Sequence, residues 1–297
     1  MNSSDRNIRT AAIAALLSLC WTAGAVSAND ETSNAPKTKL LLTVNEVREL
    51  MDDSKDSPVI LLDCQDRAAY EKAHLPGARW VDVASWKSAA LADGGAGLTN
   101  QKRWAELCGE RGLTRDARII VYGGDLPNAA RVWWLLKYVG CRYVSLMDGG
   151  IDRWRQKELP VSDAQVEFSA STFDPEFQKQ RLAICDGVKQ AAQDRDWVVF
   201  DTRSASEFAD GRVPGAAHLE WKRLLTEEGT FKPVSDLRRM FHALEMRPTR
   251  TAVTYCRSGG RASVEAFALE LAGYENVRNY FCSWQEYSSD ADAPIEK

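Results

Sequence analysis

Histidine is scarce in this chain, and its cysteines are scattered along it. The 297 residues include three histidines, His74, His218 and His242, and seven cysteines, with no Cys-x-x-Cys pair and no cysteine–histidine cluster. Zinc sites gather such ligands at short spacings, and small secreted proteins hold their folds with dense disulfides. We therefore expect no metal, no other cofactor, and a fold that is stabilised by its apolar core.

Strong charge of one sign and long apolar runs are also missing from most of the chain. The formal net charge is −4, and it becomes −5 without residues 1–28, which hold Arg6, Arg9 and Asp5. Such a chain has no electrostatic reason to bind nucleic acid or anionic membranes. Beyond residue 28, no segment is apolar over the length that a bilayer requires. We expect small molecules, rather than nucleic acid or lipid, as partners.

The amino-terminal segment has the composition of an export signal. Two arginines precede the apolar stretch TAAIAALLSLCWTAGA, and the small residues of VSA end it just before Asn29. This pattern predicts a Sec-type signal peptide over residues 1–28, with an uncleaved membrane anchor as the alternative. Cys20 follows a leucine, which argues against a lipoprotein. We expect an exported protein, periplasmic in a bacterium or otherwise secreted, with no membrane segment after cleavage.

The rest of the chain repeats itself. The stretch VILLDCQDRAAYEKAHLPGARWVD, at residues 59–82, returns as WVVFDTRSASEFADGRVPGAAHLEW at residues 197–221. Each copy places an aspartate at the end of an apolar run and follows it with a short acidic segment and a PGA turn. Residues 117–154 return in the same way as residues 251–287, with an apolar run, a loop, a helical pattern, a glycine and an aromatic-rich end. A long-period repeat of this kind predicts two domains of one design.

The periodicity of the repeat predicts its fold class. Short continuous apolar runs alternate with amphipathic helical patterns, which is typical of a parallel sheet covered on both faces. We therefore expect two α/β domains, each a mainly parallel sheet flanked by helices, at residues 38–161 and 181–290. The polar stretch 162–180 lacks sustained periodicity and reads as a linker. Trp133 and Trp134 make one helix unusually apolar, and we expect them to pack between the two domains.

The loop TYCRSGGRAS, at residues 254–263, carries the clearest chemical signal. Cys256 follows the apolar run TAVTY and precedes a helical pattern. Parallel sheets bind ligands at the carboxyl ends of their strands, where helix amino termini face outward. A curled Ser258-Gly259-Gly260 segment would turn its backbone N–H groups toward one centre and form an anion-binding nest. The nest and the nearby arginines would stabilise a reactive thiolate, and a buried, inert cysteine is the alternative.

The paired domains and the CRSGGRAS loop resemble the rhodanese-type sulfurtransferases, in the tandem form that includes the thiosulfate and mercaptopyruvate sulfurtransferases. Loop, PGA turns, strand-end aspartates and a closing tryptophan segment, DRW in the first half and SW in the second, occur in matching order in both halves, over nearly all of the chain beyond residue 28. The family implies that only the second domain is catalytic. The sequence agrees, because Gly123 stands in the first copy where Cys256 stands in the second. The first loop, GGDLPNAA, also lacks the arginines.

The resemblance implies ping-pong transfer through a persulfide on Cys256. The thiolate would attack the outer sulfur of a donor and release sulfite if the donor is thiosulfate. A thiophilic acceptor, such as cyanide, a small thiol or a thiol protein, would then take the sulfur. The loop amides would hold the persulfide. Arg257 and Arg261 are the candidates for attracting the anionic donor, with a solvated surface charge as the alternative for each.

Four further residues complete the candidate site. Arg203, in DTR, stands where the family places a substrate-binding arginine, and Asp201 would fix that strand end. The segment FCSW replaces the Gly-Ser-Trp that is common in the family, with Trp284 as a supporting residue. Cys282 lies in this segment, and our hypothesis is that it reaches the persulfide or pairs with Cys256 under oxidation. An incidental small residue in a tight loop is the alternative.

The sequence leaves the identity of the sulfur donor and the class of reaction open. Arg257 favours thiosulfate, Ser258 is the choice of the mercaptopyruvate enzymes, and the following Gly-Arg resembles stand-alone rhodanese domains. Phosphatases of the same fold use a loop one residue longer than the six residues from Cys256 to Arg261, and a narrower ring suits a sulfur atom better than a phosphate. The sequence favours thiosulfate sulfurtransfer. Mercaptopyruvate as donor, or a persulfide carrier with little turnover alone, is the alternative.

Overall fold

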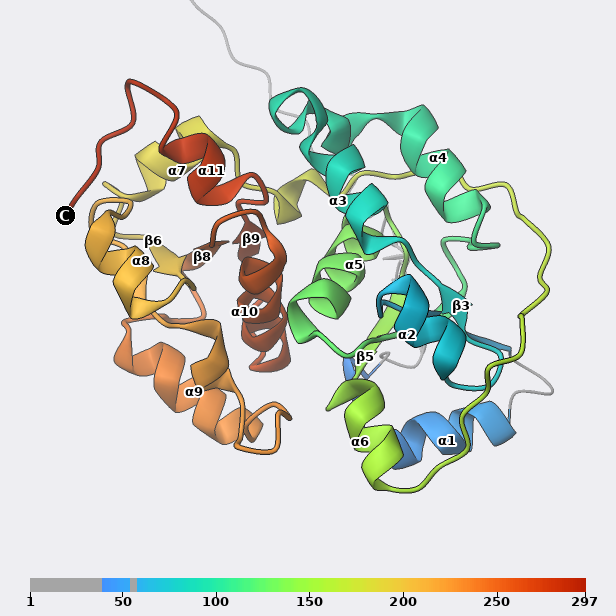
Figure 1. Ribbon diagram of the computed structural model, residues 1–297. Helices are drawn as coiled ribbons and strands as arrows, with labels where there is room; N and C mark the ends of the chain where they lie inside the picture. Colours follow the sequence, from blue (N-terminus) through green and yellow to red (C-terminus); the bar gives the residue numbers. More distant parts are fainter. Residues whose placement is uncertain (1–38, 54–57) are drawn as a thin grey trace, which may run out of the picture. The chain divides into compact units, whose positions relative to one another are not determined.

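Two parallel sheets flanked by helices form the structure, a computed structural model that describes residues 39–53 and 58–297 (Figure 1). The predicted signal peptide lies outside the described residues. The predicted α/β class with two similar domains is confirmed. In the part of the chain that the structure describes, no helix has the length and apolarity needed to cross a membrane.

The first sheet has the strand order β1-β5-β4-β2-β3, and every neighbouring pair is parallel. Its strands are β1 (Leu41–Leu42), β2 (Val59–Asp63), β3 (Arg79–Trp80), β4 (Arg118–Tyr122) and β5 (Tyr143–Met147). Its helices are α1 (Val44–Asp52), α2 (Arg67–Lys72), α3 (Val83–Leu91), η1 (Ala92–Thr99), α4 (Gln101–Gly109), α5 (Leu126–Tyr138) and α6 (Gly150–Gln156). Alternate residues of β4 point into different cores, since Ile119 and Val121 join one apolar cluster and Ile120 and Tyr122 join another.

The second sheet has the order β7-β6-β8-β9 and is likewise parallel throughout. Its strands are β6 (Trp197–Asp201), β7 (Ala217–His218), β8 (Thr251–Tyr255) and β9 (Val277–Asn279). Its helices are η2 (Lys179–Arg181), α7 (Cys185–Ala191), α8 (Ala205–Asp210), η3 (Trp221–Leu224), α9 (Val234–Ala243), α10 (Gly260–Leu271) and α11 (Ser283–Tyr287). Helices α9 and α10 pack on one face of this sheet, and α7 and α11 pack on the other.

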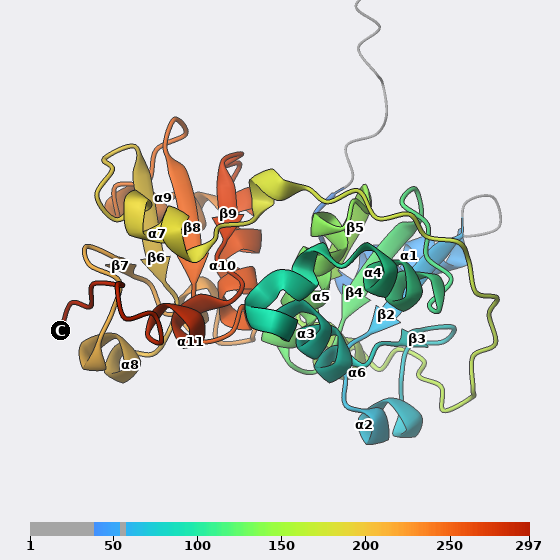
Figure 2. The same cartoon turned by 90° about the horizontal axis from the view of Figure 1, so that it is seen from above.

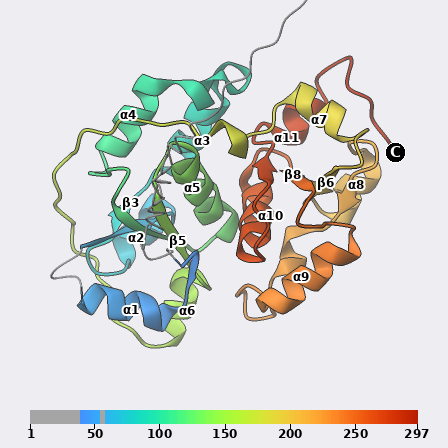
Figure 3. The same cartoon turned by 180° about the vertical axis from the view of Figure 1, so that it is seen from behind.

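Helices α5 and α10 lie side by side and join the two halves of the described chain (Figure 3). The indole of Trp133 meets the ring of Phe267 edge to face at 4.8 Å, and Trp134 stacks on Phe281 at 5.3 Å. Such aromatic pairs add to the stability that burial alone provides. The prediction that this tryptophan pair packs between the two domains is confirmed. The apolar character of α5 follows from burial on both sides.

The segment between the two sheets is extended. No helix or strand lies between Gln156, at the end of α6, and Lys179, at the start of η2, and an isolated bridge joins Ser162 to His74. The exact limits of the domains and of the linker stay a prediction. The fold thus places two carboxyl strand ends, at Asp63 and at Asp201, in equivalent positions of two similar sheets.

Candidate active site

The loop after β8 curls tightly between the strand and α10. Helix α10 begins at Gly260, and Gly259 at its cap has φ +87°. A Cβ on Gly259 would lie 2.9 Å from both the ring and the carbonyl oxygen of Phe281. Only glycine fits, because the backbone angle and the space both exclude a side chain. The predicted use of Gly259 in the curl therefore has a steric cause.

The same curl leaves several backbone donors free. Among the described residues, no protein acceptor receives a hydrogen bond from the N–H groups of residues 257–261. These groups surround the amino end of α10, where the helix dipole favours negative charge. The Cys256 N–H, by contrast, donates to the Ser283 hydroxyl at 3.1 Å. The loop therefore offers an anion the donors that a nest requires.

The Cys256 thiol is buried in polar surroundings. Its side chain is 2% exposed, and the Ser283 hydroxyl lies 4.0 Å from Sγ. Ser283 in turn donates to the carbonyl of Tyr280 at 2.7 Å, which fixes its hydroxyl beside the sulfur. The neighbouring Arg257 is exposed. It lines a pocket of about 420 Å³ together with Arg203 and Trp284.

Glu207 holds Arg261, the second loop arginine. The guanidinium donates to both carboxylate oxygens, at 2.6 and 2.9 Å. These hydrogen bonds raise the pKa of Arg261, and the nearby Cys256 sulfur acts in the same direction. Arg261 also lowers the pKa of Glu207 to about 2. Glu207 is not among the residues predicted from the sequence, although Ser204 and Glu207 form a capping box at the start of α8 that fixes the carboxylate there.

Asp201, Arg203 and Tyr255 form a buried network under the loop. Arg203 is 2% exposed. Its Nε lies 2.9 and 3.0 Å from the two Asp201 oxygens, and its Nη2 donates to Asp201 and to the Gly211 carbonyl, each at 2.6 Å. Burial acts to lower the pKa of Arg203, but the Asp201 carboxylate raises it above its ordinary value. The Tyr255 hydroxyl donates to Asp201 at 2.6 Å. The structure thus gives Asp201 the expected anchoring position, while donor binding by Arg203 stays a prediction.

Cys282 and Trp284 occupy different surroundings at the edge of the site. The Trp284 ring lies 4.4 Å from the Arg203 guanidinium carbon and covers it. Cys282 Sγ lies 3.9 Å from the carbonyl of Gly94, and a Cβ on Gly95 would come within 2.4 Å of the sulfur. Burial raises the pKa of Cys282 to about 12, so the thiol is protonated at neutral pH. A meeting of Cys282 with Cys256 stays a hypothesis.

The duplicated sheets and the cysteine loop match a known family. The family model for the rhodanese-like domain matches residues 43–157 and matches again at residues 185–290. The chain belongs to the rhodanese family. It is a tandem rhodanese-type sulfurtransferase, because both halves match and its curated relatives carry sulfurtransferase names.

Three curated relatives are similar to this rhodanese over most of its length. The "Putative thiosulfate sulfurtransferase" of Haloferax volcanii is 32% identical over 252 residues, which cover 78% of this chain and 86% of the relative. The "Thiosulfate sulfurtransferase" of Corynebacterium glutamicum is 29% identical over 254 residues, covering 78% and 82%. The "Sulfur carrier protein TtuD" of Thermus thermophilus is 27% identical over 282 residues, covering 87% and 97%. These relatives support sulfurtransferase chemistry in general.

Solved structures agree with the fold. The wild-type structure of EanB superposes on this rhodanese with a TM-score of 0.76, covering 86% of this chain and 69% of EanB. The sequences are 20% identical, so the likeness concerns the architecture alone.

The first domain of this rhodanese keeps the strand-end network but not the loop. The Asp63 carboxylate pairs with Gln65, which donates to it from its N–H at 2.8 Å and from its side chain at 2.9 Å. Gln65 thus stands where the second domain has Arg203. A Cβ on Gly123 would lie 3.2 Å from the Cβ of Cys64, a tight contact that a small shift of Cys64 would relieve. That the first domain is not catalytic stays a prediction, which rests on the glycine at position 123.

Two cations near Cys256 come from the first domain, and sequence reasoning missed both. Arg131, on α5, is buried, and its Nη1 donates to the Ser258 carbonyl at 2.5 Å. Burial lowers the pKa of Arg131, while the Cys256 sulfur and Asp125 raise it. Lys87, on α3, is the other. A lone arginine in the apolar run of α5 was a signal for Arg131, whereas nothing in the sequence distinguishes Lys87.

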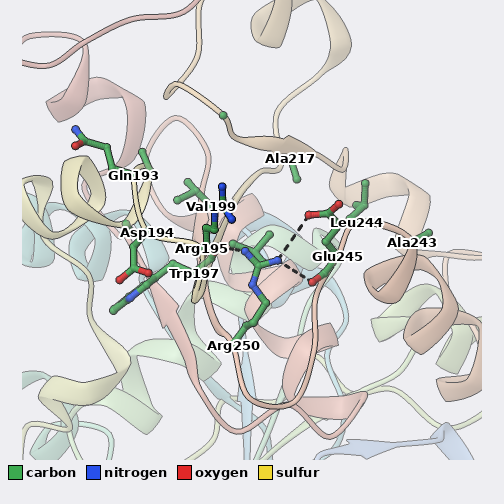
Figure 4. Close-up of a pocket in the computed structure, with 14 residues that line it drawn as sticks. Gln193, Asp194, Arg195, Trp197, Val199, Ala217, Ala243, Leu244, Glu245 and Arg250 are labelled. Atoms are coloured by element: carbon green, nitrogen blue, oxygen red, sulfur yellow. Dashed lines mark hydrogen bonds and ion pairs between the residues drawn. The ribbon is translucent and has the colours of Figure 1, made fainter.

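A further pocket lies away from the Cys256 loop. Figure 4 shows a pocket of about 440 Å³ lined by Trp197, Val199, Glu245 and Arg250. It lies at the amino end of β6, whereas Cys256 follows the carboxyl end of the parallel strand β8. Within residues 39–53 and 58–297, no group of three or more His, Cys, Asp or Glu side chains is placed to hold a metal ion.

Proposed function

We propose that this rhodanese transfers the sulfane sulfur of thiosulfate to a thiophilic acceptor through a persulfide on Cys256. The observation that carries the proposal is the position of this cysteine, beneath free backbone N–H groups at the amino end of α10. Two relatives named for thiosulfate sulfurtransfer support the choice of donor. The exposed Arg257 and the adjacent pocket provide a place for the donor's sulfonate oxygens.

The proposed reaction balances without an oxidant. The Cys256 thiolate attacks the outer sulfur of thiosulfate, a new S–S bond forms, and the S–S bond of thiosulfate breaks. Sulfite leaves with the electron pair of that bond. A cyanide or thiolate acceptor then attacks the outer sulfur of the persulfide, and the Cys256 thiolate leaves. The free N–H groups of the loop stabilise the negative charge on sulfur in both steps.

Thiocyanate formation from thiosulfate and cyanide tests this proposal. We expect the wild type to be active, the Cys256→Ser variant to be inactive, and the Cys185→Ser variant, at a half-buried cysteine outside the candidate site, to keep its activity. Thiosulfate alone should add the mass of one sulfur atom to the peptide that contains Cys256. Activity in the Cys256→Ser protein, or a sulfur adduct on another cysteine, would refute the mechanism.

A persulfide carrier is the second candidate function. The burial of Cys256 and the relative named as a sulfur carrier favour it. A carrier would form the persulfide with thiosulfate but would release little thiocyanate, and it would pass the sulfur to a thiol protein. The same assay with 3-mercaptopyruvate compares the other donor that Ser258 suggests. Faster turnover of a chromogenic phosphate ester than of thiosulfate would point to a phosphatase instead.

Export is proposed on the amino-terminal sequence. Residues 1–28 have the pattern of a Sec-type signal, which would place the sulfur chemistry in the periplasm or outside the cell. Cell fractionation with amino-terminal sequencing of the product tests this. A product that retains its first residues in the cytoplasm would refute export.

A further inference from the structure

Successive carbonyl groups of the catalytic loop accept hydrogen bonds from the elements around it. Two N–H groups of α11 donate to the carbonyls of Cys256 and Arg257, at 3.0 and 3.1 Å. Ser263 donates to the carbonyl of Gly259 from its N–H at 2.9 Å and from its hydroxyl at 2.8 Å. These donors belong to the second domain. The Ser258 carbonyl differs, because its donor comes from the first domain.

Arg131 is the donor to the Ser258 carbonyl. It lies on α5, which meets α10 where the two halves of the described chain face each other (Figure 2). Its guanidinium is buried, and Nη1 donates to the carbonyl at 2.5 Å. A Cβ on Gly260 would lie 2.6 Å from Nη2, and the guanidinium carbon lies 5.5 Å from the centre of the Phe281 ring. A hydrogen bond, a steric contact and a ring contact therefore fix the guanidinium against the loop.

The Ser258 carbonyl and the Gly259 N–H belong to one peptide unit. The unit is planar and trans, so its C=O and N–H bonds point in opposite directions. Because the carbonyl is held toward α5, the N–H of Gly259 points to the opposite side of the loop. Among the described residues this N–H has no protein acceptor. The hydrogen bond from Arg131 thus sets the direction of a free donor in the loop that carries Cys256.

The glycine in this peptide unit makes an external constraint necessary. Gly259 has φ +87°, but glycine adopts negative φ as readily, so the unit could rotate and turn its carbonyl inward. An inward carbonyl would present partial negative charge where the free N–H groups present partial positive charge. Arg131 opposes this rotation, because a buried carbonyl or guanidinium that loses its hydrogen-bond partner costs free energy.

We propose that Arg131 is a positioning residue of the catalytic loop: by holding the Ser258 carbonyl toward α5, it turns the Gly259 N–H toward the reactive sulfur. The proposal rests on the function proposed above and names a residue on which the transfer depends. The Gly259 N–H then stabilises the negative charge that the sulfur bears in both steps. The first domain thereby takes part in the reaction without touching a substrate.

Kinetics of sulfur transfer from thiosulfate to cyanide test this role. Arg131→Met removes the donor, whereas Arg131→Lys keeps a cationic donor. Arg181→Met is the matched control at the same interface, because Arg181 pairs with Glu270 of α10 and its guanidinium carbon lies 5.6 Å from the centre of the Trp133 ring of α5. We expect Arg131→Met to lower kcat/KM for thiosulfate about tenfold, since one hydrogen bond to a charged group is lost. Arg131→Lys and Arg181→Met should stay within about threefold of the wild type.

Two kinetic outcomes would overturn the proposal. One is an equal loss in Arg131→Met and Arg181→Met, which would mean that the interface matters and the loop contact does not. The other is an unchanged kcat/KM in an Arg131→Met protein that circular dichroism shows to be folded.

NMR of the peptide unit itself gives a readout that a merely structural role would not move. The dipeptide Ser-Gly occurs once in the chain, at Ser258 and Gly259. Isotope labels on serine carbonyl carbons and glycine nitrogens therefore select this unit alone. In the wild type, loading Cys256 with sulfur from thiosulfate should shift the Gly259 amide resonance, and in Arg131→Met this shift should be lost. A shift of the same size in the variant would refute the positioning role.

The unloaded protein separates this proposal from the proposed function. Loss of the hydrogen bond should move the Ser258 carbonyl resonance in Arg131→Met and leave it in place in Arg181→Met, whether or not the protein transfers sulfur. A wild type that forms no persulfide, with the carbonyl resonance moved as expected, would refute the proposed function and leave the role of Arg131 in the loop intact. A carbonyl resonance that is the same in Arg131→Met and the wild type would overturn the proposal.

Discussion

The Glu265→Gln variant of this rhodanese should become increasingly more stable than the wild type as the pH rises. Glu265 lies in the middle of α10 with 0% exposure, and neither of its carboxylate oxygens has a hydrogen-bond partner in the described structure. Burial raises its pKa well above the ordinary value, and the charge of Asp201 acts in the same direction. The carboxyl group is therefore protonated in the folded protein over a pH range in which the unfolded chain ionises it.

The sign of the effect follows from proton linkage. Because the folded-state pKa is raised, the stability of the wild type is greatest below the unfolded pKa and falls as the pH rises toward the folded pKa. Each pH unit in that window costs about 1.4 kcal/mol of unfolding free energy. The Glu265→Gln variant has no such proton to lose. Burying the neutral glutamine amide also costs free energy, but that cost does not depend on pH.

Urea unfolding at pH 5, 6 and 7, at constant ionic strength, measures the difference. We expect the free energy of unfolding of Glu265→Gln minus that of the wild type to grow as the pH rises, by at most about 1.4 kcal/mol for each pH unit. Glu275→Gln, at an exposed position of the same domain, controls for the change of net charge. Parallel pH profiles for wild type and Glu265→Gln would refute the reasoning, because they would mean that Glu265 titrates alike in both states.

Two further predictions concern the loops. The Glu207 pKa is lowered to about 2, so its ion pair with Arg261 adds stability above the ordinary carboxyl pKa and loses it as the pH falls toward 2. Glu207→Gln should therefore unfold at a higher pH in an acid titration followed by circular dichroism, and identical acid transitions would contradict this. Gly123→Cys should not create a second active site, because its loop, GGDLPNAA, lacks the arginines that follow Cys256. Mass spectrometry after thiosulfate treatment should find the added sulfur on Cys256 alone, and a persulfide on the new cysteine would show that the first loop is competent.

The parts of the site that sequence could predict are local ones. Cys256, the glycines after it and the aspartate at the end of β6 all lie next to a strand end, and the repeat revealed the strands. Burial in a parallel sheet produces continuous apolar runs, so the pattern and the fold have one cause. The helical pattern predicted after the cysteine is the helix α10, which begins at Gly260 after Gly259 has turned the chain.

The parts that sequence could not predict depend on packing between segments far apart in the chain. Arg131 lies in a domain whose loop has no cysteine, and its hydrogen bond to the Ser258 carbonyl requires the contact between α5 and α10. The burial of Arg203 could not be predicted from the sequence either. The motif DTR is compatible with a guanidinium that faces a donor and with one that pairs with Asp201.

The two copies of the sheet explain why the chain keeps a domain that lacks a cysteine. Both copies pair a strand-end aspartate with a tyrosine on the adjacent strand, Asp63 with Tyr122 and Asp201 with Tyr255. The shared network holds the fold in each. Only the second copy places a thiol at the adjacent strand end, and the first packs α5 against α10 and supplies Arg131, which donates to the Ser258 carbonyl of the catalytic loop. A catalytic domain separated from its partner would retain Cys256 but would lose this support of the loop and expose the apolar face of α10.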